Sequence, residues 1–374
     1  MTPSKPSDPL PSSVTPVDFM EKGSLERALS ATVRTQPMQG FDAEYTDIVD
    51  YILRCTHRIW EEKGVGLIYS HYSHNCVIHT AYGTTYGREQ VVADTLRHLA
   101  AFPDRKLYGD DVIWSGDDQS GFHTSHRILT TAQHTGYGPY GAPTGRRLRY
   151  RTVAHCLVRE NMIVEEWLVR DSLSIARQLG LDPFQLARQM ATADPYPELR
   201  PEGDLSLGRG QFPPTGHTSR HATSFDSGNF DLEDFDLEDF VRDTWQSVWN
   251  GRMLNLVNKR YHPSFEGYWP DNRKLHGPAE QLQVILGVLA TFSDAVLTVD
   301  HLSANGDEAR GHRVAVRWTL TGTHDGHSIY GPPSGKRVRI LGISHQHIQE
   351  GRIMREWTVY DGLALLKQLA SPLE

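Results

Sequence analysis

The sequence predicts an α+β fold made of two tandem copies of one small domain. The length of 374 residues suits two domains, because most domains contain about 100–200 residues. The second half of the chain repeats the first, and each half runs from helical patterns into a series of strands. Two curved antiparallel sheets, each wrapped around its own helices, satisfy all three observations.

The repeat is clearest towards the end of each half. When residues 134–179 are placed over residues 324–369 without gaps, 18 of the 46 positions are identical. A weaker match continues upstream in the same order, where Trp60 corresponds to Trp249. A match of this length predicts a duplicated domain rather than a short shared motif.

These matches divide the chain into four parts. We expect a disordered leader over residues 1–41, a first domain over 42–182, a linker over 183–229 and a second domain over 230–374. The linker is rich in Pro, Gly and Ser and contains one short helical pattern, Phe184–Met190. The acidic segment at 230–240 is either an interaction tag or the acidic first turn of the second domain's opening helix.

Each copy is expected to open with a helix and to continue through a loop and a second helix into strands. Val314, Val316 and Trp318 recur at every second position, which is typical of a strand with one buried face. Glu160-Asn161 and Glu350-Gly351 predict tight turns between the last two strands of each copy. The expected second helix, strands and closing helix are 89–101, 106–114, 122–131, 147–159, 162–170 and 172–179 in the first copy, and 279–291, 295–302, 312–321, 337–349, 353–360 and 362–369 in the second.

Composition limits the classes of function. The net charge of −8 argues against general nucleic-acid binding, and no apolar run approaches the roughly 18 residues that a membrane helix needs. Three cysteines without a CxxC pair predict reduced thiols rather than disulfides, which favours a cytoplasmic protein. Without a CxxC pair the sequence also gives no sign of a metal site, and we expect none.

Several segments resemble the SnoaL-like branch of the NTF2-like superfamily. The resemblance rests on GxPxGxR, on the Glu-Trp-x3-Asp block and on the closing Gln-Leu, and it covers nearly all of residues 42–182 and 235–371. It implies a conical α+β barrel with an apolar pocket at its open end, as in polyketide cyclases, ketosteroid isomerase, limonene-epoxide hydrolase and many binding-only proteins. The resemblance therefore also implies a small molecule as the binding partner, with no cofactor. Because single-domain relatives often dimerise, it also implies an intramolecular pseudo-dimer, with a homodimer of the whole chain left open.

Glu166 and Glu356 are the first catalytic candidates. An apolar cone raises the pKa of a carboxylate, which makes that group a usable general acid or base. Each glutamate precedes a tryptophan on the last strand, Trp167 or Trp357, and one member of each pair must face inward. Either the glutamate lies in the pocket, or it lies on the surface beside a core tryptophan; the tryptophans are candidates for substrate contacts.

Histidines and aspartates form a second group of catalytic candidates. His155 and His345 stand in the middle of strands, as pocket acid–base groups or as hydrogen-bonded core histidines. His345 with His347 offers only two metal ligands, which is weak evidence for a metal site. Asp171 and Asp361 precede the closing helices, where an N-cap is the favoured role.

The remaining candidates would contact substrate. Tyr82, Tyr268 and Trp269 precede the second helix of their copies and are expected as pocket walls. Arg317 either anchors an anionic substrate or pairs with a carboxylate. A role in a turn and a role in the pocket are both open for His134 and His324.

The acid–base pair of the family's cyclases is missing from this sequence. Alignment on Trp-x3-Asp places Leu168 and Thr358 where the cyclases carry aspartate, and Ala154 and Ser344 where they carry histidine. His155 stands one residue further along, so it faces the other side of the sheet. The cyclase mechanism therefore does not transfer to this chain.

Three functions remain open. The main hypothesis is a cofactor-independent acid–base enzyme, of lyase, isomerase or cyclase type, acting on an apolar or aromatic small molecule. The alternatives are a non-catalytic small-molecule-binding or scaffold protein, and an epoxide-hydrolase-like enzyme that activates water through an Asp–Arg–Asp set in one cone. Fold alone does not choose among them.

Overall fold

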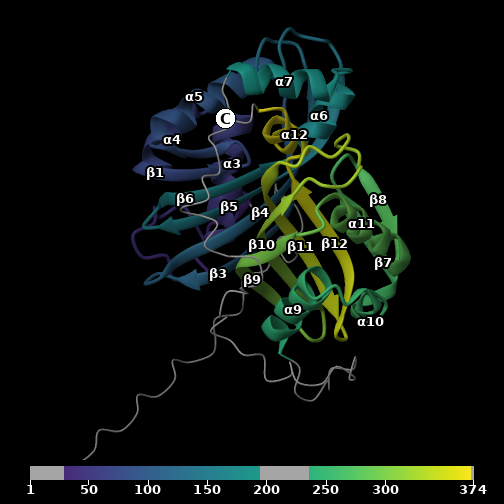
Figure 1. The fold of residues 1–374 in the computed structure, drawn as a ribbon. Coiled ribbons are helices and arrows are strands. Elements are labelled where there is room, and N and C mark those ends of the chain that lie inside the picture. The colour runs from purple at the N-terminus through teal and green to yellow at the C-terminus, as the bar shows by residue number, and fades with distance from the viewer. Residues whose placement is uncertain (1–28, 194–235, 372–374) are drawn as a thin grey trace, which may run out of the picture.

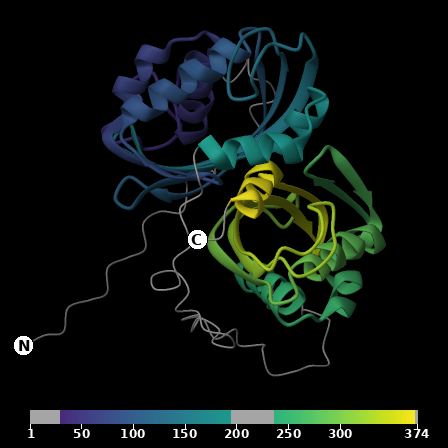
Figure 2. The same ribbon diagram turned by 45° about the horizontal axis from the view of Figure 1, so that its top comes forward.

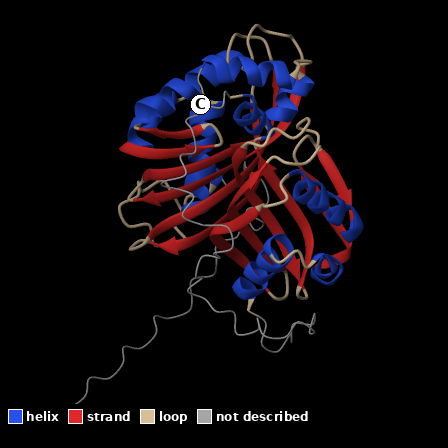
Figure 3. Cartoon of the chain, viewed as in Figure 1, coloured by secondary structure: helices blue, strands red, loops and turns tan. Residues whose placement is uncertain are grey.

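The computed structural model describes residues 29–193 and 236–371, which form two domains of the same α+β architecture. Each domain contains a six-stranded curved sheet with helices packed against it (Figure 1). Strands of the two sheets meet in the middle of the molecule, and most helices lie around the outside (Figure 3). The predicted fold class is confirmed.

The first domain opens with α3, which begins at Asp47, where the carboxylate accepts a hydrogen bond from the N–H of Asp50. A side-chain cap of this kind satisfies an N–H group that the helix leaves free. The elements in order are α3 (Ile48–Thr56), η1 (His57–Glu61), η2 (Val65–Leu67), α4 (Ile68–His71), β1 (Tyr72–Thr80), β2 (Gly83–Tyr86), α5 (Arg88–Ala101), β3 (Lys106–Asp117), β4 (Gly121–Gln133), β5 (Arg147–Arg159), β6 (Met162–Arg170), α6 (Ser172–Gln178) and α7 (Pro183–Ala193).

The second domain repeats this order, including the turn of π-helix that follows the opening helix in both copies. Its elements are α9 (Leu237–Trp245), η4 (Gln246–Asn250), η5 (Leu254–Leu256), α10 (Val257–Arg260), β7 (Tyr261–Trp269), β8 (Arg273–His276), α11 (Gly277–Thr291), β9 (Val296–Asp307), β10 (Gly311–Thr323), β11 (Arg337–Gln349), β12 (Arg352–Tyr360) and α12 (Gly362–Ala370).

The sheets run in the orders β2-β1-β6-β5-β4-β3 and β8-β7-β12-β11-β10-β9. β1 pairs in parallel with β6, and β7 with β12, whereas the other neighbours are antiparallel. The hairpins β1–β2 and β7–β8 occupy segments for which we predicted a loop, so that part of the prediction was wrong. Their position depends on pairing with a strand about 90 residues away, and a local pattern does not report such a partner.

The turns predicted between the last two strands of each domain are present. Glu160 and Asn161 have φ angles of 45° and 69°, and Glu350 and Gly351 have φ angles of 50° and 65°. Two successive residues with positive φ are the geometry of a type I′ turn, which matches the twist of the strands it joins. These turns fix the register of β5 with β6 and of β11 with β12.

Part of the expected leader and linker is ordered. Met38 and Phe41 are buried in the first core although they precede residue 42, and the helix predicted near Phe184 is α7, which packs on α12 of the second domain. Asp236 caps α9 and its first turn is acidic, so the helix interpretation of the acidic segment is confirmed there. The rest of the expected leader (1–28), of the linker (194–229) and of the acidic segment (230–235) lies outside the described residues.

The two sheets pack against each other through an apolar centre formed by Val153, Val169, Ile343 and Val359. Two cation–π contacts flank that centre. The guanidinium of Arg127 lies 3.9 Å from the ring centre of Trp357, and that of Arg317 lies 3.5 Å from that of Trp167. These contacts are reciprocal, because Arg317 is the repeat equivalent of Arg127 and Trp357 that of Trp167, each 190 residues further along the chain. Figure 2 shows the second barrel almost end-on, with α7 and α12 side by side between the domains.

Within the described ranges, the helices are all too short or too polar to cross a membrane.

Candidate active site

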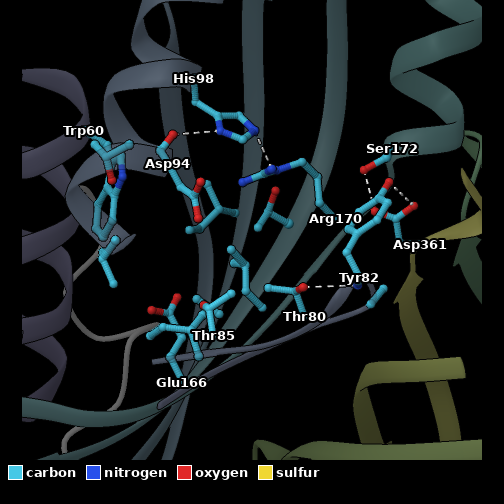
Figure 4. Close-up of a pocket in the computed structure, with 18 of the residues that line it drawn as sticks. Trp60, Thr80, Tyr82, Thr85, Asp94, His98, Glu166, Arg170, Ser172 and Asp361 are labelled. Carbon is cyan, nitrogen blue, oxygen red and sulfur yellow. Dashed lines mark hydrogen bonds between the residues drawn. The ribbon is translucent and has the colours of Figure 1, made fainter. Parts of the chain in front are cut away.

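A cavity of about 480 Å³ lies inside the first barrel. Its walls come from α3 and η1, the β1–β2 hairpin, α5 and the inner face of the sheet. The second domain closes one side with Asp361 and Leu363, at the start of α12. Figure 4 shows the polar groups of the cavity, with Glu166 on one side and Tyr82, Ser172 and Asp361 on the other. The enclosed volume suits a small organic molecule.

Glu166 is one of two buried carboxylates of this cavity, together with Asp361. It lies on β6, and the hydroxyl of Tyr72 donates to its Oε2 at 3.0 Å. Burial raises its pKa to about 7, although Tyr72 and Arg170 act in the opposite direction. A carboxyl group with a pKa near neutrality exchanges a proton readily with a bound molecule.

The matching Glu356 of the second domain is held quite differently. It accepts hydrogen bonds from Gln346 at 2.7 Å, Thr358 at 3.1 Å, Tyr261 at 3.3 Å and Gln281 at 3.4 Å. Its pKa is also raised by burial, but its oxygens are fully engaged with protein donors. Three of those four donors are replaced in the first domain by the apolar cavity residues Cys156, Leu168 and Val91. Glu166 therefore faces the cavity with capacity to accept a ligand's hydrogen bond or proton.

Arg170 and His98 form the cationic part of the site. The Nη1 of Arg170 donates to Nε2 of His98 at 2.6 Å, and Nδ1 of the same ring donates to the carbonyl of Asp94 at 3.0 Å. Burial, together with the charge of Arg170, lowers the pKa of His98 to about 3. The neutral ring thus positions the guanidinium, whose Nε is buried and has no partner among the described residues. An anionic or carbonyl oxygen is the natural complement of such a group.

The third polar cluster joins the two domains. Asp361 accepts hydrogen bonds from Ser172 at 2.5 Å and from Tyr82 at 3.3 Å, while it also caps α12. Burial raises the pKa of Asp361 to about 6, against the effect of Ser172 and the N–H of Ala364. A residue of the second domain therefore orients a tyrosine of the first domain's cavity.

The corresponding space in the second barrel is filled by aromatic side chains. Trp245, Trp269, Trp318 and Tyr360 belong to one packed cluster, in which Trp318 lies 6.0 Å from Trp245 and 6.3 Å from Tyr360 between ring centres. A Cβ atom on Gly342 would lie 2.1 Å from the Trp318 ring, so this wide side chain fits only against glycine. At the matching positions the first domain has smaller or more polar cavity residues: Thr56, Thr80, Ile128, Thr152 and Arg170.

The structure does not bring the predicted histidines into the cavity. His155 and His345 are fully buried, but they face the interface between the domains, where His345 shares a hydrogen bond of 2.8 Å with Ser125. Trp167, Trp357 and Arg317 lie on the same outer face of their sheets and form the reciprocal contacts between domains. Strand alternation explains this, since Glu166 and Trp167 are neighbours and only one of them can point inward.

Other predicted residues divide between the cavity and structural positions. Tyr82 lines the cavity, whereas Tyr268 stacks on Trp357 at 5.4 Å and Trp269 is buried in the second core. The N-caps expected for Asp171 and Asp361 are both present. Inside the long loops after β4 and β10, His134 shares a hydrogen bond with Thr144, and His324 shares one with Ser334. His347 shares a hydrogen bond of 3.3 Å with the carbonyl of Arg310, whereas His345 is bonded to Ser125.

Sequence reasoning missed most of the polar cavity residues. His98, Arg105, His126, Thr130 and Arg170 line the cavity, and at the matching positions the second domain has Val288, Ala295, Val316, Leu320 and Tyr360. The equivalence of His98 and Val288 is structural as well, because each accepts the capping N–H that ends its helix. A position-by-position comparison of the two copies would have found them, because these positions are polar in the first copy and apolar in the second.

Comparison with known proteins identifies the family. The SnoaL-like polyketide cyclase family matches residues 51–179 and 239–369, well over half of the chain. The chain therefore belongs to the SnoaL-like family, with two family domains in tandem. A search among curated proteins finds no match.

Solved structures of single domains are similar to parts of this chain. One, from Jannaschia sp. CCS1, described as a candidate SnoaL-like polyketide cyclase, is 20% identical, with 36% of this chain and 92% of that chain covered and a TM-score of 0.33. AclR from Streptomyces galilaeus, described as a candidate hydroxylase, is 25% identical, covering 37% and 86%, with a TM-score of 0.32. IdmH from Streptomyces antibioticus, described as a candidate polyketide cyclase, is 23% identical, covering 35% and 96%, with a TM-score of 0.31.

Leu168 and Ala154, which stand at the acid–base positions of the family's cyclases, both line the cavity. These positions thus face the interior, but here they carry no ionisable group. Glu166 lies two residues before Leu168 and on the same face, so it supplies a carboxylate from a neighbouring point of the same strand.

Proposed function

We propose that the first domain is a cofactor-independent acid–base enzyme acting on an apolar or aromatic small molecule, and that the second domain supports it structurally. The observation that carries this proposal is the contrast between the two glutamates. Glu166 faces the cavity and has a pKa of about 7, whereas Glu356 is held by four donors inside a packed core. Duplication frees one copy to act as a scaffold, and the two domains together act as an intramolecular pseudo-dimer.

The reaction type follows from the groups around the cavity. The ionised Glu166 removes a proton from a carbon next to a carbonyl of the bound molecule, and the developing oxyanion is held by Arg170. Return of the proton at another position gives an isomer. Alternatively, the enolate carbon attacks a second carbonyl and closes a ring, and the proton held by Glu166 moves to the new alkoxide. Exclusion of water by the cavity strengthens the interaction between Arg170 and the oxyanion.

The substrate class follows from the same surface. Ile52, Trp60 and Ile163 provide apolar or aromatic contacts, and the polar groups lie at separated points of the cavity. A rigid hydrophobic skeleton with one or two carbonyl or hydroxyl groups matches that distribution. A volume of about 480 Å³ excludes macromolecular substrates.

Water activation is the second candidate reaction. Arg170 lies within electrostatic range of two of the cavity carboxylates, since its charge opposes the raised pKa of Glu166 and of Asp361. An acid–Arg–acid arrangement of this kind could orient water for attack on an epoxide. Incorporation of ¹⁸O from labelled water into product would select this reaction, and its absence would select proton transfer.

A pocket-filled variant tests whether the cavity binds ligand. Ile128→Trp with Thr152→Gly copies the Trp318–Gly342 pair, which already packs well in the second domain at the same register. We expect the wild type, incubated with a library of hydrophobic ketones and phenols, to retain ligands in native mass spectrometry, and the filled variant to retain none. Equal retention by both proteins would contradict the proposal.

Catalysis is tested with the ligands found in this way. In D₂O the wild type should introduce deuterium next to the ligand's carbonyl, and Glu166→Gln should slow this exchange by at least 100-fold. Ligand binding without exchange or turnover would instead establish a non-catalytic binding protein.

A further inference from the structure

A second cluster of ionisable groups lies at the domain interface, on the sheet face opposite the cavity. It consists of His123 on β4, His155 on β5 and His301 on β9, so two members come from the first domain and one from the second. Between ring centres, His301 lies 4.1 Å from His123 and 4.8 Å from His155. One nitrogen of each ring lies within 4.8 Å of the other two, and Nε2 of His155 lies 3.4 Å from Nδ1 of His123.

The reciprocal place in the interface is built from charged partners. There the positions matching His301 and His123 hold Asp111 and Arg313, which form an ion pair. The ion pair is neutral overall, whereas at the first place the three imidazoles share one long hydrogen bond, of 3.4 Å, between His155 and His123. At the reciprocal place, the hydroxyl of Ser125 shares a hydrogen bond with His345. The position that matches Ser125 in the second domain is Ala315, so His155 has no such hydroxyl beside it.

The histidine cluster therefore contains nitrogen atoms with no partner. Nδ1 of His155 and Nδ1 of His301 are buried and make no hydrogen bond within residues 29–193 and 236–371. A buried polar atom without a partner destabilises the fold, and a bound ion is one recognised way to satisfy it.

We propose that His123, His155 and His301 bind one divalent transition-metal ion of the zinc type, which links the two domains. Three imidazoles without a carboxylate or thiolate suit Zn²⁺, with water as the fourth ligand. Ligands at about 2.1 Å from a tetrahedral ion lie about 3.4 Å apart, so the widest pair must close by about 1.4 Å. Side-chain rotation of the half-buried His123 and His301 can supply that movement.

One nearby group opposes the ion. The positive charge of Arg317 lies close enough to all three rings to repel a cation bound there. The negative charges of Asp300 and Glu165 lie near Arg317 and partly offset that repulsion. The guanidinium is also held on the Trp167 ring, which keeps it in place beside the cluster. The site is separate from the cavity, so its test is independent of the enzyme proposal.

Zinc titration of the full chain, after treatment with EDTA, tests the site. We expect one Zn²⁺ per chain and a rise in the thermal unfolding temperature on binding. His123→Gln and His301→Gln should each weaken zinc binding by at least tenfold, because each removes one of three ligands. His347→Gln is the matched control: it removes a histidine outside the cluster and should leave binding unchanged.

X-ray absorption at the zinc edge of the wild type gives a readout that does not depend on any variant. Three imidazole ligands support the site. Fewer than three, no binding at one equivalent, or unchanged binding in both His123→Gln and His301→Gln would overturn it.

Discussion

Replacement of Glu166 by glutamine should change how the stability of the protein depends on pH. Glutamine keeps the shape of the protonated carboxyl group but cannot ionise. In the folded protein the pKa of Glu166 is about 7, compared with 4.5 for an unperturbed glutamate. Below pH 4.5 the wild-type carboxyl group is protonated in both states, so the two proteins should show a constant difference in the free energy of unfolding.

Between pH 4.5 and 7 the unfolded wild-type chain loses this proton while the folded chain keeps it. Because the folded pKa is raised, its contribution to stability is present at low pH and is lost as pH rises through 7. A shift from 4.5 to about 7, at 1.36 kcal/mol per unit, corresponds to about 3 kcal/mol. Relative to the wild type, Glu166→Gln should therefore gain about 3 kcal/mol of unfolding free energy between pH 4.5 and pH 8.

Urea unfolding at half-unit pH intervals measures this difference directly. Glu308→Gln is the control, because this glutamate is exposed and distant from the cavity. A difference between Glu166→Gln and the wild type that stays flat from pH 4.5 to 8 would refute the electrostatic reasoning. A flat profile would mean that Glu166 is solvated, and the acid–base proposal would lose its main support.

Three further predictions concern the division of roles between the domains. Arg170→Met should weaken binding of a carbonyl-containing ligand by about 1.5–3 kcal/mol, as calorimetry would show, since it removes a charged hydrogen-bond donor; unchanged affinity would exclude Arg170 from the ligand site. Asp361→Asn should keep the cap of α12 but lower turnover in the first domain, whereas Asp171→Asn, at the matching cap, should leave turnover unchanged; equal effects on initial rates would contradict a role across the interface. Trp318→Ala should destabilise the protein by about 3–5 kcal/mol in denaturant unfolding without affecting ligand affinity; a matching loss of affinity would show that the second barrel also binds the ligand.

The strands of each sheet were predictable because their signals are local. Alternation around Val316 and the turn residues at 160–161 and 350–351 marked the long hairpins, and four strands have the predicted bounds: 147–159, 162–170, 337–349 and, within one residue, 353–360. The hairpins that begin at Tyr72 and Tyr261 were missed, since their strands are completed by parallel pairing with a distant strand.

The candidate site was only partly predictable. Glu166 and Tyr82 were selected from the sequence, and both line the cavity. Glu166 could be selected because it stands beside a tryptophan on a strand, where one of the two side chains must point inward. The sequence left His155 and His345 open between the pocket and the core, and the structure places both as buried residues on the outer face of their strands. His98 and Arg170 come from different elements and meet only in the folded barrel.

By itself the sequence determined the duplication, the α+β class and the alternation of residues along each strand, because these depend on the order of side chains along the chain. Tertiary structure alone decided which barrel is hollow, which face of each sheet meets the other domain, and that Asp361 serves the cavity of the other copy. Those outcomes depend on side-chain volumes summed over residues far apart in sequence, and only packing in three dimensions brings these volumes together.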